Sequence, residues 1–199
     1  ALAGAGTAVM VEASLPGDIA EACRRFRLTA LGAVPSVLAH LSPEDIPTVR
    51  FLISWAEHLP EAVAARWRGR VPLCDLLIAT EYWLALFMDN EDTAGSGGRA
   101  LRIVGGVDVQ IVEPDGEAPV EGGAVGELCL SGATVFPGYA DPEDDKGRFL
   151  DIEGRRYFRT RDLVRWIEPR RLLDYCGRCD DMAKVGGKWV DTLTLEASI

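Results

Sequence analysis

Short apolar runs alternate with segments of helical apolar spacing through the first half of the chain. Strands are predicted at residues 8–11, 30–34, 49–54 and 71–78. Helices are predicted between them, at residues 19–26, 36–41 and 60–68. Because parallel strands need crossover connections, this order predicts an α/β fold with a mostly parallel sheet flanked by helices.

Residues 93–98, Thr-Ala-Gly-Ser-Gly-Gly, interrupt the alternation. Small, flexible residues neither hold a helix nor pack a strand, so we expect a domain boundary here. Beyond it, short strands with close connections predict a small antiparallel β-barrel, at residues 107–112, 125–130, 156–160, 163–167 and 171–176. We therefore expect an α/β part at residues 1–98, a β-barrel at 99–176 and the start of a small C-terminal domain at 177–199.

The charge of the chain excludes some classes of partner. Its 31 acidic and 21 basic residues give a net charge of -10, which repels a polyanion. No apolar run is long enough to span a bilayer, and the opening residues lack the basic region of a signal peptide. We therefore expect a cytoplasmic protein with no nucleic-acid partner and no membrane partner.

Two of the five cysteines, Cys176 and Cys179, have the Cys-x-x-Cys spacing of zinc and redox sites. A metal site needs a second pair of ligands. The other three cysteines lie singly in apolar stretches, where cysteine behaves as a small hydrophobic residue. The sequence therefore favours free thiols in a reducing compartment.

Four clusters contain residue types that can bind ligands or take part in catalysis. The first is Thr80-Glu81, directly after the predicted strand 71–78, where ligands of open parallel sheets bind. Its alternative is a helix N-cap followed by an acidic first-turn residue.

The second cluster comprises residues 126–132, Gly-Glu-Leu-Cys-Leu-Ser-Gly, and the turn at residues 136–139, Phe-Pro-Gly-Tyr. We give it a structural role, in which glycines permit close backbone approach and Tyr139 fills a gap.

The third and fourth clusters lie in the last quarter of the chain. The third is residues 158–163, Phe-Arg-Thr-Arg-Asp-Leu, and the fourth is residues 177–190, Gly-Arg-Cys-Asp-Asp-Met-Ala-Lys-Val-Gly-Gly-Lys-Trp-Val. Each has a simple structural alternative. In the third, Asp162 would be a solvated turn aspartate paired with Arg159 or Arg161, and the fourth would be a charged surface hairpin.

Together and in this order, the four clusters resemble the signature motifs of the adenylate-forming superfamily, which includes acyl-CoA and aryl-CoA ligases, luciferase and peptide-synthetase adenylation domains. The resemblance implies ATP and Mg²⁺ as ligands. It implies that Thr80 donates a hydrogen bond to the α-phosphate and that Glu81 binds magnesium. It also implies that Asp162 holds both ribose hydroxyls, since a carboxylate accepts two hydrogen bonds from a vicinal diol.

The fourth cluster implies further roles in that family. Arg178 would reach the ribose or a phosphate of the nucleotide. Asp180 would be the hinge between the large and the small domain. Lys184, Gly186 and Gly187 would belong to the loop that lines the tunnel of the thiol acceptor.

The resemblance leaves two functions open. In the first, the chain is part of a ligase that uses ATP to convert a small carboxylic acid into an acyl-adenylate, for transfer to CoA or to a carrier-protein thiol. In the second, it is a catalytically inactive adenylation-like domain that acts as a scaffold or interaction module. Both functions imply other chains or domains of a larger synthase as partners.

The chain also departs from the family pattern. The family's phosphate-binding loop and its catalytic lysine would fall outside residues 1–199. Trp55 replaces a small residue that leaves room for adenine and substrate, and Leu77 and Ile78 replace the stacking ring and a glycine. Arg161 replaces a glycine that is expected to need a positive φ. We therefore expect weak or no binding of magnesium-ATP by this chain.

Overall fold

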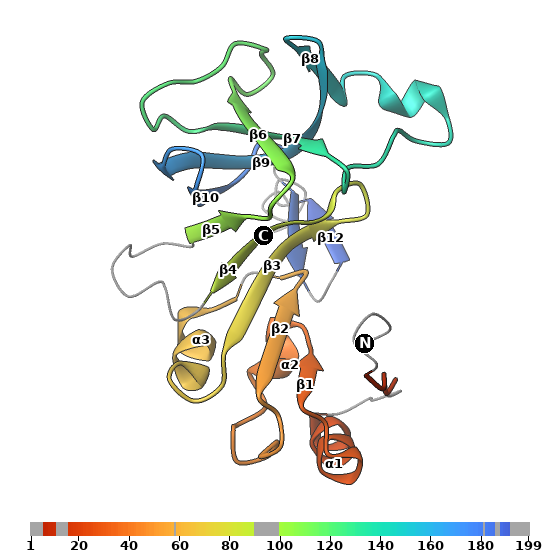
Figure 1. The fold of residues 1–199 in the computed structure, drawn as a ribbon, viewed down its shortest axis with the longest axis vertical. Helices are drawn as coiled ribbons and strands as arrows, with labels where there is room; N and C mark the ends of the chain where they lie inside the picture. Colours follow the sequence, from red (N-terminus) through yellow and green to blue (C-terminus); the bar gives the residue numbers. More distant parts are fainter. Residues whose placement is uncertain are drawn as a thin grey trace.

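The computed structural model describes residues 6–10, 16–57, 59–89, 100–180, 182–185 and 188–191, and only the backbone of residues 89, 182–185 and 188–191. These residues form an α/β fold built on one mixed ten-stranded sheet (Figure 1). The strand order is β1-β2-β3-β4-β5-β10-β9-β7-β6, and β8 pairs with β9. The α/β class predicted from the sequence is therefore confirmed.

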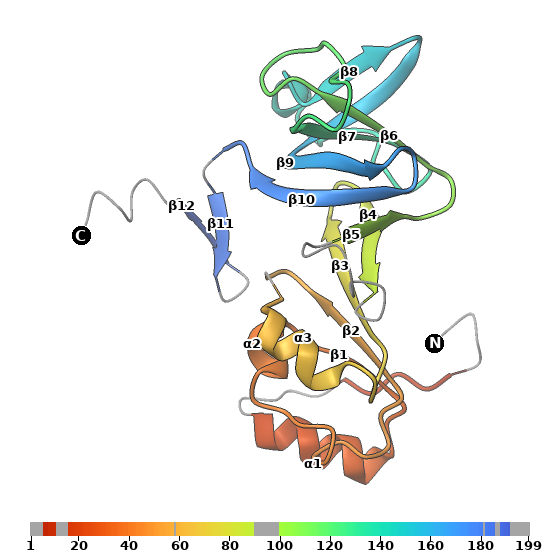
Figure 2. The same ribbon diagram turned by 90° about the vertical axis from the view of Figure 1, so that its left-hand side faces the viewer.

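The parallel part of the sheet consists of β1 (Ala30–Gly32), β2 (Phe51–Trp55) and β3 (Leu73–Ala79). The helices α1 (Pro16–Phe26), α2 (Pro35–Leu38) and α3 (Glu61–Trp67) precede or connect these strands. In Figures 1 and 2, α2 and α3 lie on the same side of the strands, and α1 lies at the end of the molecule farthest from β8. Arg66 of α3 donates hydrogen bonds to the Ala39 and Leu41 carbonyls just after α2, which fixes the two helices together.

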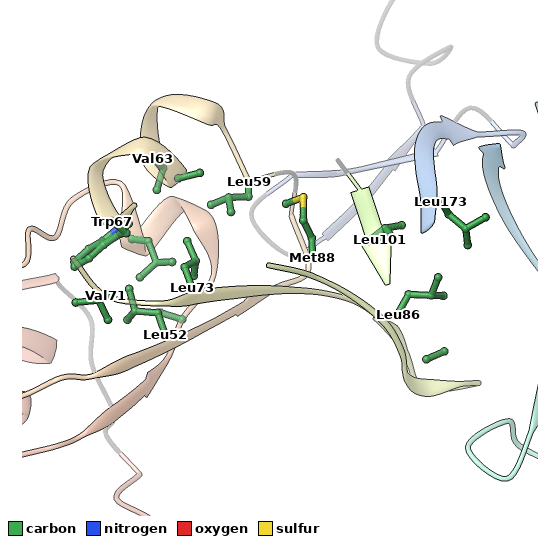
Figure 3. Close-up of a cluster of buried hydrophobic side chains, with 14 of the residues drawn as sticks. Leu52, Leu59, Val63, Trp67, Val71, Leu73, Leu86, Met88, Leu101 and Leu173 are labelled. Atoms are coloured by element: carbon green, nitrogen blue, oxygen red, sulfur yellow. The ribbon is translucent and has the colours of Figure 1, made fainter. Parts of the chain in front are cut away.

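The hydrophobic core runs along the sheet from the helices to the antiparallel strands. Helix α3 buries Val63 and Trp67, which are four residues apart and therefore share one face. Figure 3 shows these side chains against Leu52 and Leu73 of the parallel strands. The same cluster continues to Leu173 of β10, so one core supports both parts of the sheet.

The antiparallel part begins where β3 turns back into β4 (Trp83–Asp89). Its other strands are β5 (Ala100–Ile103), β6 (Val107–Val112), β7 (Gly126–Gly132), β8 (Phe149–Ile152), β9 (Arg155–Glu168) and β10 (Leu172–Arg178), with a short 3₁₀ helix at Pro142–Asp145. Strand β10 pairs with β5 on one side and with β9 on the other. It therefore joins β9, β7 and β6 to β5 and β4, and β4 continues the sheet to the parallel strand β3.

This connection explains why the predicted β-barrel is not confirmed. Among the described residues the strand order is an open path that ends at β6, because the strands expected to close a barrel extend the first sheet through β10 and β5 instead. The expected strands 156–160 and 163–167 are one strand, β9. The expected strand 8–11 is wrong for Ala8–Met10, which form no regular structure, and Val11 lies outside the described residues.

The division of the chain into three domains stays a prediction. The boundary expected near residue 98 falls on residues 90–99, which lie outside the described residues. Beyond β10, β11 (Met182–Val185) and β12 (Lys188–Asp191) pair as an antiparallel hairpin. No helix within the described part of the chain is long and apolar enough to cross a membrane.

Candidate nucleotide and metal site

The turn between β3 and β4 carries the first predicted pair, Thr80 and Glu81. Thr80 is exposed, Glu81 is half-buried, and the following Tyr82 is buried. Thr80 and Glu81 line an open hollow of about 240 Å³, whose other side is Phe136 and residues 138–140. These residues belong to the loop that follows β7, which can be followed in Figure 1. Because this turn joins two antiparallel strands, the helix N-cap alternative is wrong.

Glu81 is held by the loop that follows β7 through two hydrogen bonds. The Phe136 backbone N–H donates to the Glu81 carbonyl at 2.8 Å. The Tyr139 hydroxyl donates to Glu81 Oε1 at 3.0 Å. Burial and the hydrogen bond to Glu81 both raise the pKa of Tyr139 above 10.0, so its hydroxyl keeps its proton and remains a donor at neutral pH.

Asp162 is the centre of a buried polar cluster, with only 3% of its surface exposed. Its Oδ2 accepts a hydrogen bond from the Tyr82 hydroxyl at 3.3 Å. Its Oδ1 accepts from the Tyr175 hydroxyl at 3.4 Å and from Arg178 Nη1 at 3.1 Å. Burial raises the pKa of Asp162, and the positive charge of Arg178 opposes that rise. The solvated aspartate paired with Arg159 or Arg161 is therefore a wrong alternative.

Arg178 links Asp162 to the predicted hinge residue. Its Nε donates to Asp180 Oδ1 at 2.7 Å, and its Nη2 bonds to Oδ2 of the same carboxylate. Burial acts to lower the pKa of Arg178, but the hydrogen bonds and charges of Asp180 and Asp162 outweigh it and raise that pKa. One guanidinium therefore joins the carboxylates of the third and fourth clusters.

A buried ion pair connects the second cluster to the third. Arg159 donates to Glu127 through Nε at 2.8 Å and also through Nη2, and the Glu127 side chain is fully buried. The Arg161 backbone N–H donates to Glu127 Oε1 at 3.2 Å. The sequence offered a signal for this pair, because buried charges are paired and Glu127 lies in a strand of apolar residues.

The structure connects the first predicted cluster, Thr80-Glu81, with Asp162 of the third. Tyr82 contacts Asp162 although the two residues are 80 positions apart, and the neighbouring Glu81 lines the hollow. Tyr82 and Tyr175 were not predicted as site residues from the sequence. Their signal would have been a tyrosine directly after the Thr-Glu step and another three residues before Arg178.

The predicted thiol-tunnel residues lie at the edge of the described region. Lys184 lies in β11, and its side chain is outside the described residues, as are Gly186 and Gly187. The fourth cluster does contain the hairpin that its structural alternative requires. The roles of all predicted site residues remain predictions.

Three departures from the family pattern have visible structural consequences. A Cβ atom at Gly32 would lie 2.9 Å from two ring atoms of Trp55, so the indole packs directly over this glycine. Leu77 packs against the hydrophobic core. Arg161 has a φ of +66°, which confirms that this position takes the backbone conformation that favours glycine.

The metal-binding capacity of the site rests on Glu81. Among the described residues, no group of three His, Cys, Asp or Glu side chains could hold a metal ion, and no cysteine forms a disulfide. Magnesium, however, is commonly held by one or two carboxylates together with the phosphates of a bound nucleotide. A single carboxylate beside an open hollow fits that donor set.

The sequence of the chain matches a known protein family. A family model described as AMP-binding enzyme matches residues 1–140. The chain belongs to this family of adenylate-forming enzymes. It is 31% identical over 186 residues to nonribosomal peptide synthetase sidE of Aspergillus fumigatus, and the match covers 92% of this chain but 9% of the synthetase.

Solved structures of adenylation domains share the fold. The adenylation domain AlmE of Vibrio cholerae, in complex with glycyl-adenosine-5'-phosphate, matches with a TM-score of 0.70 and 26% identity over 90% of this chain and 37% of its own. PA1221, a peptide-synthetase protein containing adenylation and PCP domains, matches with a TM-score of 0.77 and 22% identity over 94% of this chain and 41% of its own. The chain therefore spans less than half of each of these relatives.

Proposed function

We propose that this chain supplies the ribose-, α-phosphate- and magnesium-contacting part of a site that activates a small carboxylic acid as an acyl-adenylate. The observation that carries the proposal is the β3–β4 turn, where Glu81 lines the hollow and the adjacent Tyr82 contacts the buried Asp162. Activation by ATP makes chemical sense because a free carboxylate is a poor electrophile. The acyl group would then pass to the thiol of CoA or of a carrier protein, which forms a thioester and releases AMP.

In the proposed site, the exposed Thr80 hydroxyl donates a hydrogen bond to the α-phosphate, and the Glu81 carboxylate is the protein ligand of magnesium. A bound magnesium ion would neutralise negative charge on the phosphates. Asp162 accepts hydrogen bonds from the ribose diol. This carboxylate is 3% exposed and accepts hydrogen bonds from two tyrosine hydroxyls and from Arg178, so the diol reaches it only when these donors give way. Where Arg178 is displaced, ribose binding is coupled to the Arg178–Asp180 contact at the proposed hinge.

The likeness to synthetase domains supports partners within a larger synthase. PA1221 contains adenylation and PCP domains in one protein. We accordingly propose that this chain works beside a carrier domain, with Lys184, Gly186 and Gly187 near the thiol and Asp180 as the hinge. The acid substrate would contact residues near Trp55, whose indole restricts the space above Gly32.

Calorimetric titration of magnesium-ATP into the wild type and Asp162→Ala tests the proposal. We expect weak binding by the wild type and a loss of about 1.5–3 kcal/mol, roughly 10- to 150-fold in affinity, in the variant. Asp151→Ala, at an exposed aspartate of β8, is the matched control and should bind like the wild type. Equal binding by wild type and Asp162→Ala would contradict the proposal, and no binding at millimolar nucleotide would favour the inactive scaffold.

A further inference from the structure

Tyr139 has only a packing role in the sequence analysis, yet its hydroxyl contacts the carboxylate of the hollow. We propose that Tyr139 is the positioning residue of Glu81 in the metal site, an inference that rests on the proposed role of Glu81. Its hydroxyl donates to Oε1 at 3.0 Å. Within the described residues, Oε2 receives no protein hydrogen bond and is the oxygen left for a metal ion.

The loop that carries Tyr139 is itself fixed by a carboxylate and a guanidinium. Asp145 Oδ1 accepts a hydrogen bond from the Tyr139 backbone N–H at 2.9 Å. Arg156 donates to Asp145 Oδ2 at 3.1 Å and to the Pro137 carbonyl at 2.7 Å. A Cβ atom at Gly138 would lie 2.6 Å from Asp145 Oδ2, so glycine is what permits this close approach. These contacts set the position of the Tyr139 backbone.

The Tyr139 ring is fixed as well. The Phe136 ring packs edge-on against it, with a centroid distance of 4.8 Å. The backbone N–H of the same Phe136 donates to the Glu81 carbonyl at 2.8 Å. One short loop therefore holds both the main chain and the carboxylate of Glu81, which restricts the rotamers that this glutamate can adopt.

Fixing the rotamer matters because Glu81 is a lone protein ligand. A free glutamate side chain loses considerable conformational entropy when it is immobilised on a metal ion. The Tyr139 hydrogen bond removes part of that freedom before the metal binds. Loss of hydrogen bonds that orient metal-ligating side chains typically costs about 10- to 100-fold in metal affinity. We expect about a tenfold loss here, at the low end, because the hollow is open to solvent.

Mn²⁺, a paramagnetic ion that shares the oxygen ligands of Mg²⁺, is the probe for this proposal. Mn²⁺ is titrated into the ¹⁵N-labelled chain in the presence of millimolar AMP, whose phosphate completes the donor set, and broadening of the Thr80, Glu81 and Tyr82 amide signals is followed. In Tyr139→Phe, the same broadening should require about tenfold more Mn²⁺, while amide signals away from the hollow keep their positions. Glu81→Gln should abolish the local broadening.

Tyr157→Phe is the matched control. Tyr157 also donates its hydroxyl to a carboxylate, Asp108 Oδ2 at 2.9 Å, but it does not line the hollow. This variant should behave like the wild type. If Tyr139→Phe also matches the wild type while Glu81→Gln loses the broadening, the role of Tyr139 is wrong and that of Glu81 stands. If the wild type shows no local broadening, both roles are wrong.

Discussion

Replacing Arg159 by methionine tests whether the second and third clusters are joined as the structure describes. The Glu127 side chain is fully buried and that of Arg159 is 8% exposed, so solvent cannot compensate for a lost partner. Arg159→Met removes the close ion pair and leaves the buried Glu127 carboxylate only Arg161, whose Nε lies 3.8 Å from Oε1. Breaking a buried pair costs about 3–5 kcal/mol of the free energy of unfolding. We expect the lower end of this range because Arg161 remains.

Urea unfolding of the purified variants measures this cost. At a slope of about 1–3 kcal/mol/M, Arg159→Met should lower the midpoint by about 1 M or more. Arg171→Met is the control, because it removes the same guanidinium from an exposed pair with Glu168, which contributes about 0–1 kcal/mol.

A second change separates loss of the pair from loss of packing. In the double variant Glu127→Gln and Arg159→Met, no charge is left buried, and the glutamine oxygen can still accept the Arg161 N–H. The double variant should therefore recover much of the stability lost in Arg159→Met. A loss in Arg159→Met no larger than in Arg171→Met would refute the buried pair.

Two further changes test the surroundings of the site. Burial raises the pKa of Asp162 above 3.8, so its contribution to stability is fully present below that pH and is lost as the pH rises through the raised pKa. Asp162→Asn cannot ionise, so its free energy of unfolding minus that of the wild type should rise as the pH goes from below 3.8 towards neutral. A difference that falls over this range would contradict a raised pKa of Asp162. Gly126→Ala should be strongly destabilising in thermal unfolding, because its Cβ would lie 2.5 Å from the Val112 carbonyl, whereas Gly17→Ala meets no atom within 4 Å and should be tolerated.

Apolar periodicity predicted the parallel part of the fold because each strand and helix there buries its own side chains. Strand β4 was missed, since its run of Leu84 to Met88 carries no alternation to set it apart. Closure of the antiparallel strands into a barrel was also predicted and is not confirmed. Whether β10 pairs with β5 depends on contacts between residues about 70 positions apart, which short-range patterns do not encode.

The candidate site was likewise predicted from the sequence only in part. Thr80, Glu81 and Asp162 could be found from short motifs, and the strand end at Ala79 places the first two. The partners of Asp162 could not, because Tyr82 is distant in sequence and the charge on Arg178 had several possible acidic neighbours. The positive φ of Arg161 was predictable only because a glycine was expected there.

The central claim is that Asp162 recognises the ribose diol of an adenosine nucleotide. NMR titration of the chain with AMP and with 2′,3′-dideoxy-AMP tests it most directly, since the two ligands differ only in the hydroxyls that the carboxylate would accept. We predict that the wild type binds AMP at least about tenfold more tightly than the dideoxy analogue, as expected for hydrogen bonds to a charged group. Asp162→Asn should lose most of this difference. Equal affinity of the wild type for both nucleotides, or a preference for AMP that persists in Asp162→Asn, would contradict it.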